Sequence, residues 1–436
     1  MKTKIVNLKY GAKLLHTYLN DVDGVSIDFI FNAGCLNDPI GKAGLAHFCE
    51  HAAFGFSTDK YSKKEREYLR HKYQYYNATT STKETWFSME VINNKLEEAI
   101  DDLTHSFTQL KYIQEEFDSE YKIICDEIIT RKKINQHQAS ILAVKNLNKE
   151  KEYKNFHNSA AGDLETVQNI TLKDIKWFIE NYYTLNNLTI LVTGNVKYKK
   201  LIKLINKYVY KNILHEGNKG FDFENYKGYN SPRYLLGEAV EKGKSYFLAF
   251  YLYNERSKYQ NIKDVCVRNL LSSCLKEKAF EYFRTDLNLC YSCGAGIAPT
   301  NKYNEFYVSV QCQDENIDDV VLAYHNFLNY FKTKLNQELL DKYIEKYNEM
   351  ENFDRKSISR ISDSRYAIYS TYNKIIDKKE FTKMRNTITL NDLKDEFEII
   401  TKSKPYLIII SDKKELENLD YKEFVKNSRI KKFLNF

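Results

Sequence analysis

A helix with one buried face is the clearest pattern among the hydrophobic positions. In residues 115–131 (EEFDSEYKIICDEIITR), large apolar side chains recur at three- and four-residue steps, at Phe117, Tyr121, Ile124, Ile128 and Ile129. That spacing is typical of an α-helix packed by one side against a core. Glu120 and Glu127 lie seven positions apart, or two helical turns, so the pattern predicts that their carboxylates point the same way.

A second pattern is a repeat of whole segments along the chain. Short apolar motifs of the first half return in the second half, two of them at the same offset of 218 residues. Self-similarity of this kind indicates two homologous halves of about 215 residues each. The matching segments are 170–176 (ITLKDIK) with 388–394 (ITLNDLK), 188–192 with 406–410, and the apolar strand expected at 25–31 with its counterpart at 246–252.

The repeat predicts the domain organisation and the fold class. We expect one domain at residues 1–216, a linker at 217–232, where glycine, asparagine, proline and charged residues gather, and a second domain at 233–436. Each half has the pattern of a strand, a long helix, further strands, two or more helices, and a final helix and strand. This order favours an α+β fold with helices on one face of a mostly antiparallel sheet. Expected core residues of the first half are Ile27, Phe29, Phe31, Ile190 and Val192.

Composition narrows the class of protein. The chain has 436 residues, of which 43% are hydrophobic, so it can bury more than one core. Its 66 basic and 59 acidic residues are mixed along the chain, which argues against a nucleic-acid-binding protein, although that class stays an alternative. We see no secretory signal and no apolar run long enough to span a membrane. We therefore expect a cytoplasmic protein with its eight cysteines reduced.

Residues 47–51 (HFCEH) carry the strongest chemical signal. On a helix, His47 and His51 lie one turn apart on the same face, so both imidazoles can bind one cation, with Glu50 beside them. Catalytic zinc usually has three protein ligands and an open position for water, and Glu127 is our candidate for the third ligand. Cys49 lies off this face and is expected to be a packed apolar residue. The order H-x-x-E-H is the inverted form of the common zinc-hydrolase motif.

These residues resemble the pitrilysin-type inverzincins, the metallopeptidase family that includes insulin-degrading enzyme and mitochondrial processing peptidase. The family's third ligand lies 76 residues beyond the second histidine, and here 127 − 51 = 76. A partner glutamate occupies the position seven residues earlier, which is Glu120. The resemblance covers most of the chain, and its further blocks are residues 32–54 around the histidines, residues 77–81 (NATTS) with Glu84 and Thr85, and residues 162–196.

The second half lacks the metal motif. Its segment at residues 265–278 (VCVRNLLSSCLKEK) should align with the zinc helix but contains no histidine, so we expect one zinc per chain. Residues 283–291 (FRTDLNLCY) resemble the family segment whose arginine and tyrosine hold the substrate backbone across a closed chamber. Arg284 and Tyr291 match that pair. In half-length members the two residues act on another subunit, so the resemblance implies a clamshell formed with a second subunit, as a homodimer or a heterodimer.

The resemblance implies a zinc endopeptidase for short or unfolded peptides, in peptide processing or turnover. Glu50 would be the general base, and Glu120 would support the ligands. The peptide substrate would add as a strand at the edge formed by Asn77, Ala78, Thr79 and Thr80. A non-catalytic subunit of a heterodimeric peptidase is the alternative.

One further motif has no expected role. Cys290 and Cys293 form a C-x-x-C motif. A structural zinc site would require a second pair of cysteines, and the sequence has no such pair. We expect both residues in a strand, where alternation would place their side chains on opposite faces.

Overall fold

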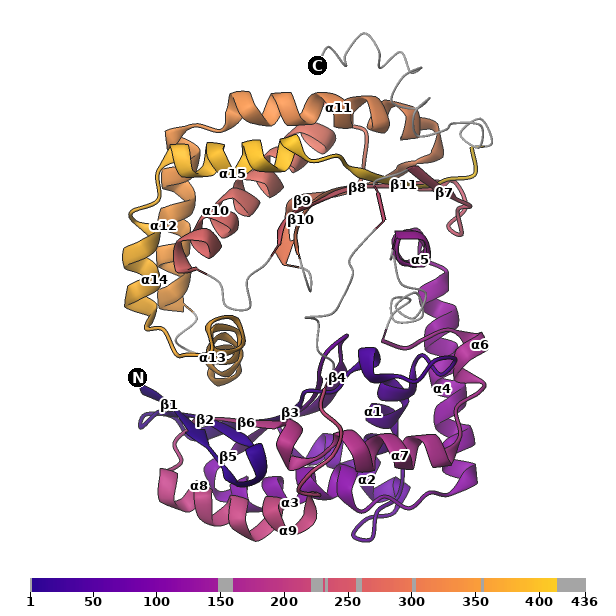
Figure 1. The fold of residues 1–436 in the computed structure, drawn as a ribbon, viewed down its shortest axis with the longest axis vertical. Helices are drawn as coiled ribbons and strands as arrows, with labels where there is room; N and C mark the ends of the chain where they lie inside the picture. The colour runs from indigo at the N-terminus through magenta and orange to yellow at the C-terminus, as the bar shows by residue number, and fades with distance from the viewer. Residues whose placement is uncertain are drawn as a thin grey trace. The chain divides into compact units, whose positions relative to one another are not determined.

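The computed structural model describes residues 2–147, 160–220, 230–231, 234–255, 261–299, 303–353 and 357–413. Figure 1 labels its helices and strands. The chain forms two compact units, and each unit includes a segment from the other half of the sequence. Unit 1 consists of residues 1–130, 151–224 and 354–375, and unit 2 of residues 131–150, 225–353 and 376–436.

Unit 1 is built on a six-stranded sheet in the order β1-β2-β6-β3-β5-β4. Only the pairing of β2 with β6 is parallel, and β4 lies at one edge. The strands are β1 (Lys2–Asn7), β2 (Lys13–Tyr18), β3 (Gly24–Phe31), β4 (Tyr75–Thr80), β5 (Thr85–Ile92) and β6 (Leu188–Gly194). The main helices are α1 (Leu45–Gly55), α2 (Lys63–Lys72), α3 (Leu96–Thr108), α4 (Gln114–Lys132), α6 (Leu164–Val167), α7 (Leu172–Tyr182), α8 (Tyr198–Leu204), a π-helical turn (Ile205–Val209), α9 (Tyr210–Asn212) and α13 (Ile358–Tyr372).

Unit 2 contains a five-stranded sheet in the order β7-β11-β8-β10-β9. Its strands are β7 (Tyr234–Gly237), β8 (Lys244–Glu255), β9 (Ser292–Pro299), β10 (Tyr303–Gln313) and β11 (Tyr406–Ile410). Its helices are α5 (Asn135–Leu147), α10 (Ile262–Ala279), a π-helical segment η8 (Phe280–Asp286), α11 (Ile317–Lys334), α12 (Gln337–Phe353), α14 (Lys378–Arg385) and α15 (Leu390–Lys402).

The two sheets have the same topology, as the internal repeat predicts. The series β2-β6-β3-β5-β4 and β7-β11-β8-β10-β9 each begin with one parallel pairing and continue with antiparallel pairings. The repeated segments also begin their helices alike. Thr171 caps α7 through Asp174, and Thr389 caps α15 through Asp392, with the threonine N–H donating to the aspartate at 2.8 Å in both cases. Such a reciprocal cap satisfies N–H groups that a helix start leaves unpaired.

Each sheet carries helices on both faces, which corrects the expectation of helices on one face. The main core of unit 1 includes all five predicted core residues, and it lies between the sheet and helices such as α3, α7 and α8. Helix α13 covers the opposite face, where Tyr366 and Tyr369 pack on Leu15, Ile30 and Leu191 (Figure 1). In unit 2, α5 packs in the same way on β8 and β11. Alternation alone could not predict this, because the covering helix comes from the other half of the chain.

The predicted linker at residues 217–232 lies largely outside the described residues, which omit 221–229 and 232–233. The two compact units exchange segments and do not divide the chain at a single point. The boundary drawn from the repeat therefore stays a prediction.

Candidate metal centre and active site

Two helices of unit 1 bring together the three predicted metal ligands. His47 and His51 are one turn apart on α1, with ring centroids 4.6 Å apart, and Glu127 comes from the second half of α4. The Glu127 carboxylate lies 3.7 Å from His47 Nε2 and 3.6 Å from His51 Nε2. One donor atom from each residue lies within 4.8 Å of the other two. This is the one such group with three donors among the residues that the structure describes.

The start of α1 is fixed by Asp38 and Gly44. Gly44 occupies the position before the first helical residue with a φ of 101°, in the left-handed region that side chains disfavour. Having no side chain, it cannot cap the helix, and the buried Asp38 carboxylate does so instead. Asp38 accepts from the N–H of Gly44 at 2.7 Å and of Ala46 at 2.8 Å. Burial raises the pKa of Asp38 to about 8, although these hydrogen bonds oppose the shift.

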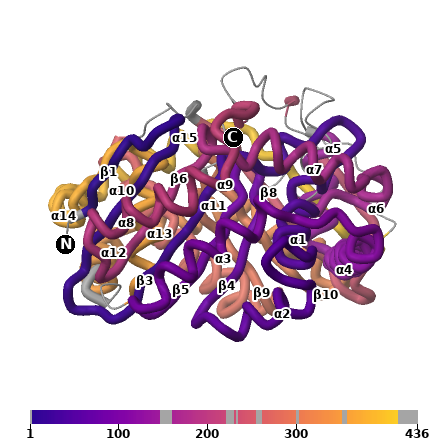
Figure 2. The backbone as a smooth tube through the Cα atoms, turned by 90° about the horizontal axis from the view of Figure 1, so that it is seen from below, coloured from indigo at the N-terminus to yellow at the C-terminus, as the bar shows by residue number. Residues whose placement is uncertain are grey.

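The other end of α1 is held by a buried arginine of α2. The Arg66 guanidinium donates to the carbonyls of Ala53 and Phe54, which the end of a helix leaves without partners. Along its length α1 packs on α7 and on the edge strand β4 (Figure 2). Phe48 stacks on Phe117 with ring centroids 4.8 Å apart, joining the two ligand-bearing helices through the core. The ligands are therefore set by packed, rigid elements.

Glu120 contacts His51, one of the three candidate ligands, and its support of a bound metal stays a prediction. Its Oε2 lies 3.3 Å from His51 Nδ1, the ring nitrogen that faces away from Glu127. Its Oε1 lies 3.3 Å from Lys63 Nζ, and the same ammonium donates to Ser119 at 2.9 Å. Burial pushes the pKa of Glu120 upward, but the His51 hydrogen bond and the Lys63 charge outweigh it and hold the pKa below its usual value. Glu120 is thus an anionic acceptor that fixes the orientation of His51.

Gly55 makes room for Glu120 at the end of α1. A Cβ at this position would lie 2.2 Å from Glu120 Oε1 and 2.3 Å from its Cδ, far inside van der Waals contact. Any residue other than glycine must therefore displace the carboxylate that contacts His51.

The predicted general base and the predicted substrate strand meet at Thr80. The Thr80 hydroxyl donates to Glu50 Oε2 at 2.6 Å, which fixes the carboxylate from the end of β4. Asn77 and Thr79 are exposed on this edge strand, whereas Ala78 is buried. An edge strand presents backbone groups that can pair with a further strand. Binding of a peptide there stays a prediction.

The donor set fits zinc. Two imidazoles and a carboxylate that converge from rigid helices form the usual protein part of a catalytic zinc site, which leaves one position for water or substrate. The equivalent helix of unit 2, α10, has no histidine, and its inward side is apolar, with Cys266, Leu270 and Cys274 buried. No helix among the described residues combines the length and apolar character needed to cross a membrane.

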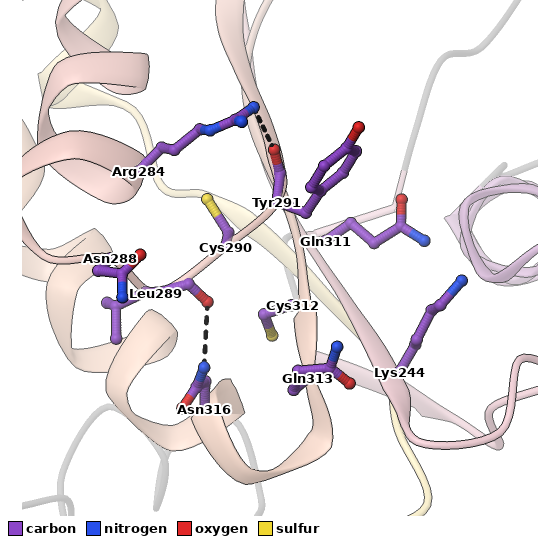
Figure 3. Close-up of a pocket in the computed structure, with 10 residues that line it drawn as sticks. All are labelled: Lys244, Arg284, Asn288, Leu289, Cys290, Tyr291, Gln311, Cys312, Gln313 and Asn316. Atoms are coloured by element: carbon purple, nitrogen blue, oxygen red, sulfur yellow. Dashed lines mark hydrogen bonds between the residues drawn. The ribbon is translucent and has the colours of Figure 1, made fainter.

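Arg284 and Tyr291 lie together in unit 2, at a pocket of about 640 Å³. Arg284 Nη1 donates to the Tyr291 carbonyl at 2.7 Å, and the guanidinium lies 5.1 Å from the centre of the Tyr291 ring (Figure 3). The Tyr291 side chain itself is 81% exposed. The structure thus brings the predicted pair together within unit 2, and its action on a zinc site stays a prediction.

Several residues of the centre were missed from the sequence. Three residues outside the motif contact α1 or Glu120, and no spacing rule connects them to residues 47–51. They are Asp38, Lys63 and Arg66. Thr80 was expected only as part of the substrate strand. Even Asp38 gave no usable signal, because it lies outside the residue directly before the helix, where a capping side chain is expected.

Comparison with known proteins agrees with this geometry. Residues 17–157 match the family model "Insulinase (Peptidase family M16)", and residues 169–347 match "Peptidase M16 inactive domain". The first model covers the candidate metal centre, and the second covers the metal-free part.

Among curated proteins, a "Zinc protease PqqE" of Helicobacter pylori is 26% identical over 48% of this chain and 46% of its own length, so that match spans about half of each protein. An "Uncharacterized zinc protease" of Rickettsia felis is 24% identical over 89% of this chain and 92% of its own length. The beta subunit of the mitochondrial processing peptidase of Neurospora crassa is 20% identical over 48% of this chain and 44% of its own.

Solved structures share the fold at low identity. A protease from Helicobacter pylori superposes with a TM-score of 0.80 at 18% identity, covering 94% of this chain and 99% of that one. The first half of the periplasmic protease PqqL of Escherichia coli gives a TM-score of 0.78 at 17% identity, covering 100% and 97%. With both family models matched in order, the chain belongs to the M16 peptidases, the pitrilysin-type metallopeptidase family.

Proposed function

We propose that this chain is a zinc-dependent endopeptidase that hydrolyses short or unfolded peptides. The observation that carries the proposal is the convergence of His47, His51 and Glu127 within 4.8 Å, with Glu50 held beside them by Thr80. Zinc bound there would lower the pKa of a water molecule and polarise the scissile carbonyl.

The chain's own residues supply the remaining chemistry. Glu50 takes the proton of the attacking water and passes it to the leaving amine. The hydroxyl of Thr80 keeps one oxygen of Glu50 in a fixed direction, which leaves the other for the proton. Glu120 would keep His51 in the tautomer whose Nε2 is free to bind a cation, with Nδ1–H donating to the Glu120 carboxylate. A substrate bound as a strand along β4 would be recognised by its backbone, so we expect little sequence preference.

The test separates chemistry from metal binding. Glu50→Gln should lower hydrolysis of an unfolded reporter peptide by about 100-fold or more while retaining zinc, because it removes only the base. Glu127→Gln should lose zinc and activity together. Glu115→Gln is the matched control, since this exposed glutamate lies on the same helix as Glu127. Wild-type activity in Glu50→Gln would contradict the proposal.

We further propose that a complete site needs a second subunit, which contributes Arg284 and Tyr291 to form a chamber. The resemblance supports this arrangement, and so does the full-length PqqL of Escherichia coli, of which this chain covers 50%. In a homodimer, a Glu50→Gln chain mixed with an Arg284→Ala chain should recover about a quarter of wild-type activity, because half of the dimers are mixed and each holds one intact site. No recovery, with both variants folded and dimeric, would contradict a composite site in a homodimer.

A non-catalytic or regulatory subunit is the second candidate. It is favoured by the match of residues 169–347 to the inactive-domain model and by the similarity to one subunit of the mitochondrial processing peptidase. It predicts that wild-type chain loaded with zinc hydrolyses no peptide alone, and that Glu50→Gln leaves the activity of its complex with a related subunit unchanged.

For the endopeptidase, we further propose a cytoplasmic location and a role in peptide processing or turnover.

A further inference from the structure

Two segments of unit 1 carry lysines and no acidic residue. Residues 1–20 contain four lysines and residues 181–215 contain six, and neither segment has an aspartate, a glutamate or an arginine. The rest of the chain then holds 66 − 10 = 56 basic and 59 acidic residues, so its net charge is slightly negative. The positive excess of the whole chain therefore comes from these two segments, although charges of both signs are mixed elsewhere.

The second segment presents lysines along one side of a helix. This helix continues without a break from α8 through the π-helical turn to the end of α9. Its inward side is apolar and packs in the core of unit 1. On its exposed side, lysines recur at three- and four-residue steps, at Lys200, Lys203, Lys207 and Lys211. Because the core holds the helix, the row of lysines has a fixed place on the surface.

The first segment extends this row into one continuous surface. The Lys9 N–H donates to the Tyr210 hydroxyl of α9 at 3.0 Å. The Lys4 ammonium lies 5.7 Å from the centre of the Tyr198 ring, at the start of α8, and Figures 1 and 2 show β1 beside α8. Segments far apart in the sequence thus bring their charges together. We call the exposed lysines of residues 4–9 and 197–211 the lysine surface.

The chain itself neutralises little of this charge. Lys207 pairs with Glu97 at 2.8 Å, and it is the one member of the lysine surface with an ion pair among the residues that the structure describes. Neighbouring side chains on one helix face are about 5 to 6 Å apart, which is less than the screening length of about 8 Å at physiological salt. The lysines therefore repel one another, and an extended anionic partner would relieve this repulsion at many points at once.

The side chains favour an anionic lipid surface over a nucleic acid as that partner. Lysine is a compact, strongly hydrated charge, whereas the planar fork of arginine suits single phosphates and bases, and both segments lack arginine. Stacking of bases needs open aromatic faces. Here Tyr10 stacks on His215 with 3.8 Å between ring centres, and the rings of Tyr198 and Tyr210 each lie beside a lysine ammonium. Leu214 is 53% exposed, and tyrosines with such apolar tips suit the level of lipid headgroups.

We propose that the lysine surface binds the face of a membrane that contains anionic lipids. The binding is peripheral, with the lysines over the headgroups, and it needs no segment that crosses the bilayer. Each lysine held near such a membrane should strengthen binding about fivefold. The proposal does not rest on the proposed peptidase function.

The test is co-sedimentation of the full chain with lipid vesicles. Wild type should bind vesicles made of equal parts of phosphatidylcholine and phosphatidylglycerol, and salt at about 1 M should release it, because the screening length falls to about 3 Å. Lys200→Gln/Lys203→Gln/Lys211→Gln should weaken binding about 100-fold, from about fivefold for each lysine. The control Lys64→Gln/Lys122→Gln/Lys173→Gln removes the same charge from exposed positions on α2, α4 and α7, and should bind like wild type.

Three results would overturn the proposal. The first is equal binding to vesicles of phosphatidylcholine alone, which would exclude a role of lipid charge. The second is an equal loss in the two triple variants, which would make net charge, and not this surface, the cause. The third is tighter binding of single-stranded DNA than of anionic vesicles at the same salt, lost in the variant of the lysine surface, which would assign the surface to nucleic acid.

Footprinting on the wild-type chain checks the contact directly. An amine-acylating reagent is applied with and without anionic vesicles, and the labelled lysines are identified by mass spectrometry. Vesicles should protect Lys200, Lys203 and Lys211, and leave Lys64 and Lys173 as reactive as before. Equal protection of both groups would contradict binding through the lysine surface. No readout uses peptide hydrolysis, so this result is independent of whether the proposed function holds.

Discussion

Replacing Gly55 with alanine should weaken metal binding without weakening the fold. The added methyl group would lie 2.2 Å from Glu120 Oε1 and 2.8 Å from its Cγ, whereas ordinary contact begins near 3.4 Å. The carboxylate must therefore move by 3.4 − 2.2 = 1.2 Å, or slightly less if α1 also gives way. The atoms that block the methyl group belong to the end of one side chain, so the backbone of α1 and α4 can stay in place.

The expected loss follows from the contact that this shift breaks. His51 Nδ1 and Glu120 Oε2 are already 3.3 Å apart, close to the limit of a hydrogen bond, so a shift of this size removes it. Loss of the carboxylate that orients a ligating histidine typically lowers metal affinity 10- to 100-fold. That corresponds to about 1.4 to 2.7 kcal/mol of binding free energy. The stability of the metal-free chain should not fall, because alanine favours a helix over glycine by up to about 1 kcal/mol.

The assay is competition for zinc against a chelating dye, with urea unfolding of the metal-free chain measured in parallel. Gly294→Ala is the control, because a Cβ there would lie 3.4 Å from its nearest neighbour and far from the ligands in the sequence. Gly55→Ala should add little to Glu120→Ala, since the side chain it displaces is then absent. Wild-type zinc affinity in Gly55→Ala, or a full additive loss in the double variant, would refute the reasoning.

Three other changes probe the same unit. Thr80→Val should lower kcat by about tenfold with KM unchanged, because it removes a side-chain hydrogen bond to the charged base Glu50 and keeps the backbone of β4 along which the substrate would pair; an equal rise in KM would contradict this. Burial raises the pKa of Asp28, under α13, to about 6, so its folded state binds a proton more tightly than the unfolded chain. The stabilisation contributed by the protonated Asp28 is nearly complete at pH 4 and is lost as pH rises through about 6. Asp28→Asn should remove this pH dependence, roughly 2 kcal/mol in urea unfolding between pH 4 and 7. Asp38→Ala should destabilise the chain by about 1 to 2 kcal/mol through loss of the α1 cap, while Asp38→Asn should retain most of it; equal thermal shifts for both would contradict a capping role.

Local patterns predicted most of the elements and the three residues that converge at the candidate metal centre. The helix expected at 115–131 is α4 (Gln114–Lys132), and the repeated segments 170–176 and 388–394 both begin helices, α7 and α15. These succeed because helical periodicity and capping depend on residues within one or two turns. Lys63 and Gly55 were not predicted, because their roles depend on which side chain of α4 folds beside them. The expectation that Cys290 lies in a strand was wrong for a similar reason. The strand β9 begins only at Ser292, and its start is set by pairing with β10.

The duplicated fold places different polar residues on the equivalent helices of the two halves. In each half, the strand that opens the repeat, β3 or β8, is followed by a long helix, α1 or α10. Helix α1 ends at Gly55, where the lack of a side chain admits Glu120, and its histidines face α4. Helix α10 has apolar residues in its middle and continues through a π-helical segment to Asp286, so its polar group, Arg284, lies at its far end. π-Helical segments often occur at functional sites because they turn side chains out of the regular helical order. The second half therefore needed no change of topology to lack the candidate ligands: apolar core residues stand in place of the histidines, and Arg284 lies at the end of the helix.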